Sequence, residues 1–428
     1  MRPTSIACAA AAGVLLTLAA VSVSTGARLK PLDPPAGPGA MAPNLTLTGN
    51  AAGDVLLTWL EPVDPKDKEK GHRLRISRLS GTNARWSAPV TIAAGTDFFA
   101  NWADFPGVAV GPKGGLAAHW LAKNGPGPYD YAIQLARSAD GGATWKRAGI
   151  LHADGTPAEH GFVAWVAEPT GLRAFWLDGR EMAKAGGSHN SHEGHAGNTA
   201  GAMTLRTAGI DSSSPEEAVD TRVCECCQTD SAWTADGPIV VYRDRSDQEV
   251  RDIYRVRRTA AGWSRPAPVH ADKWKIPGCP VNGPAVAADG RKVAVAWFTG
   301  AENRPRVKVA FSQDAGERFG PPVEVDAGRP LGRVDVVLDG QGGAVVSWLA
   351  AEGEGAAVHL RRVKNGKAGP VVSAATTGAG RSSGFPRLVR AGDTLYVAWV
   401  EDWPVSKVRV ASLPVAAVPA GQLSEAGR

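Results

Sequence analysis

The chain has 428 residues, of which 43% are hydrophobic and 21% charged, and its formal net charge is +5 at pH 7. This length and apolar content are sufficient to bury a large core within a single repeat architecture. The positive charges are spread along the chain without a sustained basic stripe, which argues against nucleic acid as a partner.

The N-terminal segment has the pattern of a signal peptide. A positively charged start, Met1 to Ser5, leads into an apolar stretch from Ile6 to Val23, and small residues follow up to Ala27. We therefore expect a signal peptide over 1–27 that is cleaved on export, followed by a Pro-rich linker over 28–42. No later segment is apolar for long enough to span a bilayer, which predicts a soluble periplasmic or secreted protein.

Short strands recur between residues 43 and 414 with a period of roughly 50 to 65 residues, which suits propeller blades. Each copy has an aromatic residue near the end of a hydrophobic strand: Trp59, Trp120, Trp176, Tyr242, Trp297, Trp348 and Trp399. Alternating Val, Ala and aromatic residues between Gly, Asp and Asn turns favour antiparallel strands.

The pattern predicts an all-β propeller of four-stranded blades over 43–414, with 415–428 as a C-terminal tail. The last unit, Phe385 to Pro414, has room for only three strands, and the Pro-rich linker does not resemble a clean fourth. Six or seven blades are therefore compatible with the sequence. The count of aromatic-ended strands favours seven.

One turn carries a resemblance to a known family. Ser138-Ala139-Asp140-Gly141-Gly142-Ala143-Thr144-Trp145 resembles the Asp-box of the sialidase and neuraminidase-like propellers, and the segment from Ser312 to Phe319 is a weaker copy. Asp and Ser oxygens can bond the amides of such a turn, Gly accepts positive φ, and the aromatic residue wedges between strands. The resemblance implies a sialidase-like propeller, with these turns opposite the active site.

The resemblance also implies an activity, that of an exo-α-sialidase-type glycosidase acting on an anionic sugar. The sequence has no Arg-Ile-Pro segment before the first Asp-box, and none of its five tyrosines lies in a recognisable nucleophile context. Binding without hydrolysis therefore stays open beside hydrolysis.

In a propeller, the loops that lead into the inner strands and the loops between second and third strands open on one face. One rim is thus expected to gather Asp104, His160, Cys224 to Cys227, Cys279, Asn282, Arg333, Asp335 and Arg387. The loops after the second strands add Arg243, Asp244, Arg245, Arg251, Glu401 and Asp402.

Sialidases hold the sugar carboxylate with three arginines, because planar guanidinium groups can grip a carboxylate through two bonds. By this resemblance, Arg333, Arg387 and either Arg243 or Arg251 would hold an anionic ligand, and Asn282 would add a polar contact. Asp104 or Asp335 would donate the proton if the protein hydrolyses a glycoside. Pairing of Arg333 with Asp335 inside the channel lining is the alternative.

Cleavage of the signal peptide would leave four cysteines, Cys224, Cys226, Cys227 and Cys279, in a compartment that permits disulfides. A bond from the cluster to Cys279 is the simplest pairing. Two disulfides, a copper or zinc site formed with His160, and a redox-active disulfide remain alternatives. His189, His192 and His195 could bind such ions loosely, or belong to a disordered insertion.

The sequence thus supports an exported propeller that binds, or by resemblance hydrolyses, an anionic glycan or a small acidic ligand at the channel mouth. A periplasmic metal-binding or redox protein built on the cysteines and His160 is the first alternative. A protein-interaction platform is the second.

Overall fold

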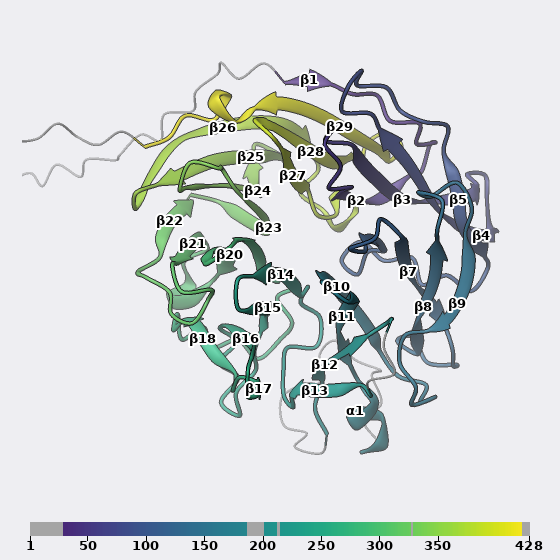
Figure 1. The fold of residues 1–428 in the computed structure, drawn as a ribbon, viewed down its shortest axis with the longest axis horizontal. Coiled ribbons are helices and arrows are strands. Elements are labelled where there is room, and N and C mark those ends of the chain that lie inside the picture. The colour runs from purple at the N-terminus through teal and green to yellow at the C-terminus, as the bar shows by residue number, and fades with distance from the viewer. Residues whose placement is uncertain (1–28, 186–200, 212–214, 327, 422–428) are drawn as a thin grey trace, which may run out of the picture.

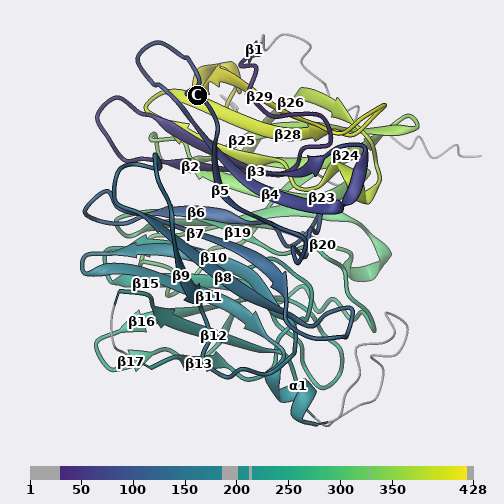
Figure 2. The same cartoon turned by 90° about the vertical axis from the view of Figure 1, so that its right-hand side faces the viewer.

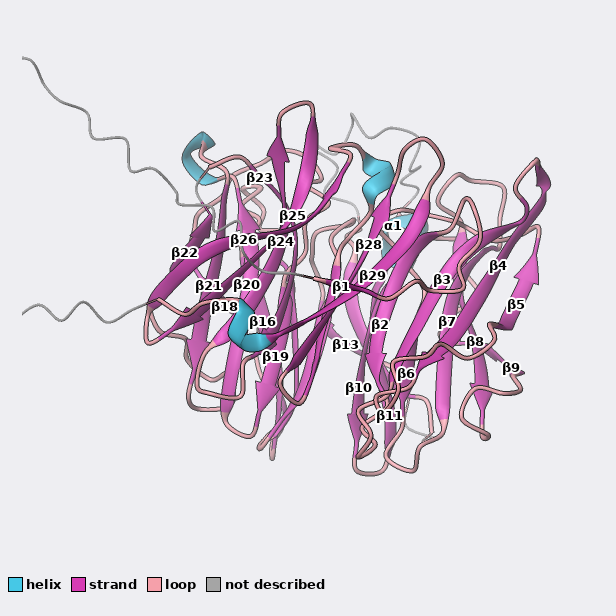
Figure 3. Ribbon diagram, turned by 90° about the horizontal axis from the view of Figure 1, so that it is seen from above, coloured by secondary structure: helices cyan, strands magenta, loops and turns pink. Residues whose placement is uncertain are grey.

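The computed structural model describes residues 29–185, 201–211, 215–326 and 328–421. Within these residues, seven antiparallel sheets, six of four strands and one of five, surround a central axis as propeller blades (Figure 1). Helical segments are few and short (Figure 3). The predicted all-β propeller is confirmed, and the blade number is seven.

The first four blades run in chain order, each from its inner to its outer strand. The first is β2 (Met41–Leu47), β3 (Val55–Asp64), β4 (Asp67–Leu79) and β5 (Val90–Gly95); the second is β6 (Gly107–Val110), β7 (Leu116–Lys123), β8 (Tyr131–Ser138) and β9 (Lys146–Ile150). The third is β10 (His160–Glu168), β11 (Gly171–Asp178), β12 (Thr204–Gly209) and β13 (Glu217–Asp220); the fourth is β14 (Asp230–Thr234), β15 (Gly237–Arg243), β16 (Ile253–Thr259), β17 (Gly262–Trp263) and β18 (Ala267–His270).

The remaining blades continue the ring. The fifth is β19 (Ala285–Asp289), β20 (Lys292–Thr299), β21 (Arg306–Ser312) and β22 (Val323–Asp326); the sixth is β23 (Pro330–Leu338), β24 (Ala344–Glu352), β25 (Gly355–Lys364) and β26 (Lys367–Thr377). The seventh has β27 (Arg387–Ala391), β28 (Thr394–Glu401), β29 (Lys407–Pro414) and, as its outer strand, β1 (Lys30–Pro31). The helical segments are α1 (Arg180–Lys184), η1 (Ala301–Asn303), η2 (Arg381–Ser383) and η3 (Val415–Ala417), and among the described helices none is long and apolar enough to cross a membrane.

The seventh blade closes the ring with a strand from the opposite end of the chain. Lys30 and Pro31 pair with Ser412 and Ala411 of β29, and β1 lies beside β29 in Figures 1 and 2. The segment predicted as a linker therefore supplies the fourth strand of this blade. Proline is accepted here because an outermost strand does not need every backbone N–H for pairing.

The repeated aromatic residues form the packing between blades. Six of them are 0–1% exposed: Trp59, Trp120, Trp176, Tyr242, Trp297 and Trp348. Four indole N–H groups donate to carboxylates, Trp59 to Glu61 at 2.8 Å, Trp176 to Asp178 at 2.8 Å, Trp297 to Asp272 at 2.6 Å and Trp348 to Asp326 at 2.7 Å. These bonds satisfy the one polar atom of each ring, so burial of the large apolar surface is not opposed by an unpaired donor.

The inner strands are tied to one another by polar side chains that bond the backbone of a neighbouring blade. Thr46 Oγ1 donates to Val108 O at 2.8 Å. In the other four bonds a side-chain oxygen accepts a backbone N–H: Asp104 Oδ1 that of Phe162 at 2.8 Å, Asp230 Oδ2 that of Val286 at 2.7 Å, Asn282 Oδ1 that of Arg333 at 2.7 Å and Asp335 Oδ2 that of Leu388 at 2.9 Å. They fix the relative positions of the strand starts, which line the mouth of the channel.

The two Asp-box-like turns have the internal bonds that the sequence predicts. Ser138 Oγ accepts from Gly142 N at 2.9 Å and Asp140 Oδ1 accepts from Thr144 N at 2.9 Å, while Ser312 Oγ accepts from Gly316 N at 2.9 Å. Both turns join the third strand of a blade to the fourth. In an antiparallel meander this places them on the face opposite the mouth.

Candidate functional site

A cluster of aromatic and arginine side chains, which we call the mouth cluster, lies where the seventh, second and sixth blades begin. It consists of Trp102, Arg333, Arg381 and Phe385. The Cζ atom of Arg333 lies 4.7 Å from the ring centre of Trp102 and 6.0 Å from that of Phe385, and the Cζ atom of Arg381 lies 6.0 Å from Trp102. The Trp102 and Phe385 rings stack with their centres 5.8 Å apart. Guanidinium groups are attracted to such ring faces.

A β-bulge directs Arg333 toward this cluster. The register of β23 against β24 shifts between Gly332 and Asp335, and Arg333 has a φ of 56°. Its backbone N–H is held by Asn282 Oδ1 at 2.7 Å. Gly332 precedes it because a Cβ there would lie 2.2 Å from the same Asn282 oxygen. Bulges of this kind re-aim a side chain and are frequent beside functional sites.

Arg333 is buried, yet its charge has no carboxylate in contact. The residue is 7% exposed, and its Nη1 donates to Ser383 Oγ at 3.0 Å and Gly384 O at 2.9 Å. Among the described residues, no acid forms an ion pair with it within 4.0 Å. Desolvation lowers the pKa of Arg333 to about 10, an effect that Asp402 opposes and Arg381 reinforces. The guanidinium stays charged at neutral pH, and an added anion would stabilise it.

Arg387 lies deeper, in the channel itself. It lines a cavity of about 250 Å³ formed by the inner strands, together with Thr229 and Asp230. Its Nε lies 3.3 Å from Asp335 Oδ2. Burial raises the pKa of Asp230 to about 7, although Arg387 acts to lower it, while Asp335 raises it further. The charge of Arg387 is thus already shared between two carboxyl groups of the chain.

Arg243 and Arg251 are held by partners within the protein. Arg243 is 1% exposed, and it donates to the carbonyl groups of Asn282, Arg251 and Phe298 at 2.6–3.0 Å. Arg251 is 0% exposed, and its guanidinium pairs with Glu225 at 2.8 Å and Glu249 at 2.9 Å. The structure therefore separates these two buried arginines from the mouth cluster.

The polar residues predicted for catalysis or ligand contact bond to the backbone. Both Asp335 oxygens accept backbone N–H groups, Val336 at 2.8 Å and Leu388 at 2.9 Å, and burial raises the pKa of this carboxyl. The Asn282 amide donates to Pro280 O at 3.2 Å and Leu331 O at 3.3 Å. Both side chains thus position the strand starts from which Arg333 and Arg387 extend.

Asp104 lies in a buried group with Tyr131 and Glu159, and the sequence did not indicate its contact with these two residues. Tyr131 donates its hydroxyl to Glu159 Oε1 at 2.8 Å and lies 3.5 Å from Asp104 Oδ2. Burial raises the pKa of Asp104 to about 7 and that of Glu159 to about 8. Gly161 makes room for this arrangement, since a Cβ at that position would lie 1.9 Å from Asp104 Oδ2. Two carboxyl groups that hold protons near neutral pH are therefore in contact with one hydroxyl.

His160 lies in a histidine and aspartate network, apart from the cysteines. Its Nε2 is 3.3 Å from Asp154 Oδ1 and 3.7 Å from Asp178 Oδ1, and its ring stacks on His152 at 3.6 Å. Arg180 Nη2 lies 3.3 Å from the same Asp154 oxygen and so already provides positive charge there. Metal-type donor atoms lie within 4.8 Å of one another in two separate groups, His152 with Asp154 and His160, and Cys224 with Cys226 and Cys279. His189, His192 and His195 lie outside the described residues.

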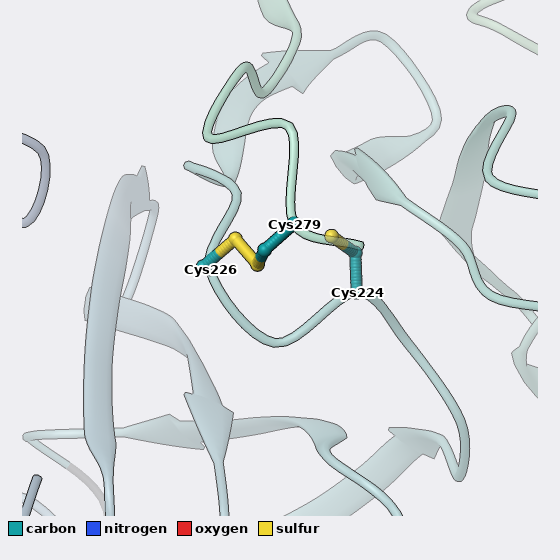
Figure 4. Close-up of side chains that lie close together, drawn as sticks. All are labelled: Cys224, Cys226 and Cys279. Carbon is teal, nitrogen blue, oxygen red and sulfur yellow. A yellow bond between two sulfur atoms is a disulfide. The ribbon is translucent and has the colours of Figure 1, made fainter. Parts of the chain in front are cut away.

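Cys226 and Cys279 form a disulfide, which is the pairing that the sequence favours (Figure 4). Cys224 and Cys227 are buried thiols whose Sγ atoms are 3.0 Å apart. A second disulfide is therefore not formed among the described cysteines. Burial opposes ionisation of Cys227, but the hydrogen bond from Cys224 and the charge of Arg243 lower its pKa to about 7. Burial and the neighbouring Cys227 raise the pKa of Cys224.

A larger groove of about 780 Å³ lies on the opposite face, between the second and third blades. It is lined by basic side chains that include Arg137, Lys146 and Arg147, and by the Asp-box residue Asp140. Arg137 is paired with Asp211. This groove is the main alternative location for an anionic ligand.

No protein-family model matches the sequence, and no similar curated protein is found. Among solved structures, the chain is similar to an ulvan lyase described as a new family of polysaccharide lyase, with a TM-score of 0.53 and 12% identity over 90% of this chain and 96% of that chain. The ulvan lyase bound to -[GlcA(1-4)Rha3S]- gives a TM-score of 0.52 with the same identity and coverage. A Hadza microbial sialidase gives 0.45, with 14% identity over 81% of this chain and 74% of that chain.

At these identities the likeness is one of fold. The chain is a seven-bladed propeller similar in fold to the ulvan lyase, and the propeller predicted from the Asp-box turns is thereby confirmed. The shared fold does not transfer any residue role.

Proposed function

We propose that this protein is an exported propeller that binds an anionic glycan, or a small acidic sugar, at the mouth cluster. The observation that carries the proposal is Arg333, a buried guanidinium without a carboxylate partner among the described residues. A buried charge is costly unless it is paired, so the ligand that completes this site is an anion.

The chemistry of the cluster fits a sugar acid better than a free inorganic anion. Arg333 and Arg381 offer planar donors suited to a carboxylate or sulfate. Both guanidinium groups lie over the Trp102 ring, and the exposed part of this half-buried side chain can contact the apolar side of a sugar ring. The ulvan lyase of the same fold, whose bound chain contains the acidic sugar GlcA, supports this ligand class.

Binding accounts for the geometry more directly than hydrolysis does. Asp104 is, with Asp335, one of the two acids that sequence resemblance suggests as proton donor, and its raised pKa would keep it protonated near neutral pH. However, it is 2% exposed, and its carboxyl contacts the Phe162 amide and the Tyr131 hydroxyl. We therefore assign Asp104 to the support of the site. Turnover of a sialoside or uronoside that is abolished by Asp104→Asn, in a folded variant, would reverse that assignment.

Isothermal titration calorimetry tests the proposal with a glucuronate-containing oligosaccharide, N-acetylneuraminic acid and a neutral oligosaccharide of equal length. We expect at least one acidic sugar to bind and the neutral one not to bind. Replacing Arg333 by Met removes charge-assisted bonds of about 1.5–3 kcal/mol, or roughly a 10- to 100-fold loss of affinity.

Arg318→Met is the matched control, because Arg318 lies at the Asp-box-like turn of the opposite face with its side chain 83% exposed. This variant should bind like the parent protein. Equal losses in both variants, or equal binding of acidic and neutral sugars, would contradict the proposal.

A further inference from the structure

The Cys224-Glu225-Cys226-Cys227 segment is a tight turn in which two cysteines are buried and one is partly exposed. Cys224 and Cys227, at the two ends of the turn, are buried and face each other with their Sγ atoms 3.0 Å apart. Cys226, inside the turn, is half-buried and bonded to the half-buried Cys279. A buried dithiol thus lies behind a more accessible disulfide.

The turn is anchored on both sides, so this arrangement is fixed by the fold. The Cys224 amide donates to Arg243 O at 3.0 Å. On the other side, Gln228 Nε2 donates to Ala103 O at 2.7 Å and Thr229 Oγ1 donates to Phe162 O at 2.6 Å. These bonds connect the turn to the second, third and fourth blades, which limits the motion of the sulfur atoms relative to one another.

The surroundings of the dithiol stabilise negative charge on Cys227, while burial and the neighbouring Cys227 keep Cys224 in its thiol form. Arg251 Nη1 lies 3.2 Å from Cys224 Sγ, and the Asn282 amide and Arg243 act on Cys227. Arg243 and Arg251 are both buried, so water does not screen their effect as it would at the surface. A cation in contact with a cysteine favours the thiolate, which is the nucleophile in thiol–disulfide exchange.

The disulfide lies within reach of this nucleophile. The sulfur atoms of Cys224, Cys226 and Cys279 are all within 4.8 Å of one another, and Figure 4 shows Cys224 beside the disulfide. We propose that the four cysteines form a thiol–disulfide relay, in which the buried dithiol reduces the accessible disulfide, and the resulting accessible dithiol reduces disulfides of small molecules or polypeptides.

The relay balances as an internal isomerisation followed by exchange with an external disulfide. Cys224 transfers its thiol proton to Cys227, whose Sγ lies 3.0 Å away, and attacks Cys279 Sγ, so that a Cys224–Cys279 bond forms and Cys226 leaves as thiolate. Cys227 then attacks Cys224 Sγ, which forms Cys224–Cys227 and releases Cys279. The two protons of the buried thiols end on Cys226 and Cys279. An external disulfide oxidises these to the original bond and leaves as two thiols.

The first test measures the rate at which the folded full chain reduces 5,5′-dithiobis(2-nitrobenzoate), an external disulfide. The relay predicts release of two equivalents of the coloured thiol by the parent protein. The double variant Cys226→Ser/Cys279→Ser keeps the buried dithiol but lacks the accessible disulfide through which the dithiol would react. Its release of the coloured thiol should therefore be at least tenfold slower. Equal rates would mean that the buried thiols react directly and would overturn the relay. Absence of release from the parent protein would overturn it as well.

The second test does not depend on the double variant folding. Cys227→Ser removes the resolving thiol but keeps the disulfide, so the relay predicts accumulation of the Cys224–Cys279 bond with a free thiol at Cys226. Acid quenching, alkylation and tandem mass spectrometry would locate this bond. Finding only Cys226–Cys279 in this variant would overturn the proposal. Arg318→Met, an exposed position on the opposite face, serves as a control with unchanged thiol release, and the relay does not rest on glycan binding.

Discussion

The two sides of the channel mouth use arginine in opposite ways. Around the starts of the fourth and fifth blades, Arg243 and Arg251 are saturated by carbonyl and carboxylate oxygens of the chain. Around the starts of the sixth and seventh blades, Arg333 lies over aromatic rings, and its guanidinium bonds, among the described residues, to a hydroxyl and a carbonyl group. The number of arginines at a mouth therefore says less about ligand binding than the partners they already have.

Arg387 is intermediate between these extremes. It contacts one carboxylate, Asp335, acts on a second, Asp230, and rests on Phe105 with its Cζ atom 5.1 Å from the ring centre. It lines the channel cavity and is partly accessible. The charge that the protein itself compensates thus decreases from Arg251 to Arg387 to Arg333. That order predicts the cost of removing each of them.

The largest effect is expected for Arg251→Met. This change leaves Glu225 and Glu249 to share a single arginine, Arg245, and breaking a buried ion pair costs about 3–5 kcal/mol of unfolding free energy. Urea denaturation followed by tryptophan fluorescence measures the loss. A loss below about 1 kcal/mol would contradict the contrast with Arg333, since the ion pairs of Arg251 would then contribute little to stability.

Arg387→Met should cost less, about 1–3 kcal/mol, because the Arg387 side chain is 21% exposed and borders a cavity, whereas that of Arg251 is fully buried. The variant should also raise the pKa of Asp230, from which it removes a nearby cation. Measuring urea midpoints at several pH values detects both effects. Unchanged stability together with lost sugar binding would instead place Arg387 among the ligand-binding arginines.

The buried acids beneath the mouth predict a pH dependence. Their folded pKa values, about 7 for Asp104 and Asp230 and about 8 for Glu159, exceed the unfolded values. The folded state therefore binds more protons, and stability falls as pH rises through these values. His119 and His152, whose pKa is lowered to about 4, act in the opposite sense, but only below about pH 6.5.

Between pH 6.5 and 8, these acids should thus lower the unfolding free energy as pH rises, most steeply at the lower end of the window where they still hold their protons. Asp104→Asn keeps an oxygen that can accept the Phe162 amide and removes one titrating group, so its slope in this window should be shallower. Parallel slopes for the variant and the parent protein would show that Asp104 does not titrate there.

The smallest effect on stability is expected for Arg333→Met, within about 1 kcal/mol of the parent protein. The change removes a desolvated charge that lacks an ion pair, while the Met side chain can still pack against Trp102 and Phe385. Thermal unfolding beside Arg251→Met gives the sharpest contrast. A loss as large as that of Arg251→Met would make Arg333 a structural residue.

The fold could be predicted because its signals are local. Each aromatic-ended strand and each Asp-box turn is complete within a few residues, and the side chains of Trp59, Trp176 and the Asp-box turns bond to neighbours in sequence. The closing strand β1 could not be predicted, since two residues of a Pro-rich segment carry no alternation, and their partner β29 lies at the other end of the chain.

The blade positions of the predicted arginines could be inferred from the sequence, but the partners of these arginines could not. Equivalent places in successive blades indicate that Arg333 and Arg387 lie at the mouth. Whether an arginine is free depends on loops distant in sequence: Arg333 meets Trp102 and Ser383, and Arg251 meets Glu225. Likewise, Tyr131 and Glu159 lie on different blades, and nothing in either local sequence indicates their contact.

The most direct test of the central claim is a crystal structure of the protein soaked with a glucuronate-containing oligosaccharide. We predict the sugar ring against Trp102, with its carboxylate within hydrogen-bond distance of the Arg333 guanidinium. Sugar bound instead in the opposite groove beside Arg137 and Lys146, with the mouth cluster unoccupied, would contradict the assignment of the mouth as the binding site.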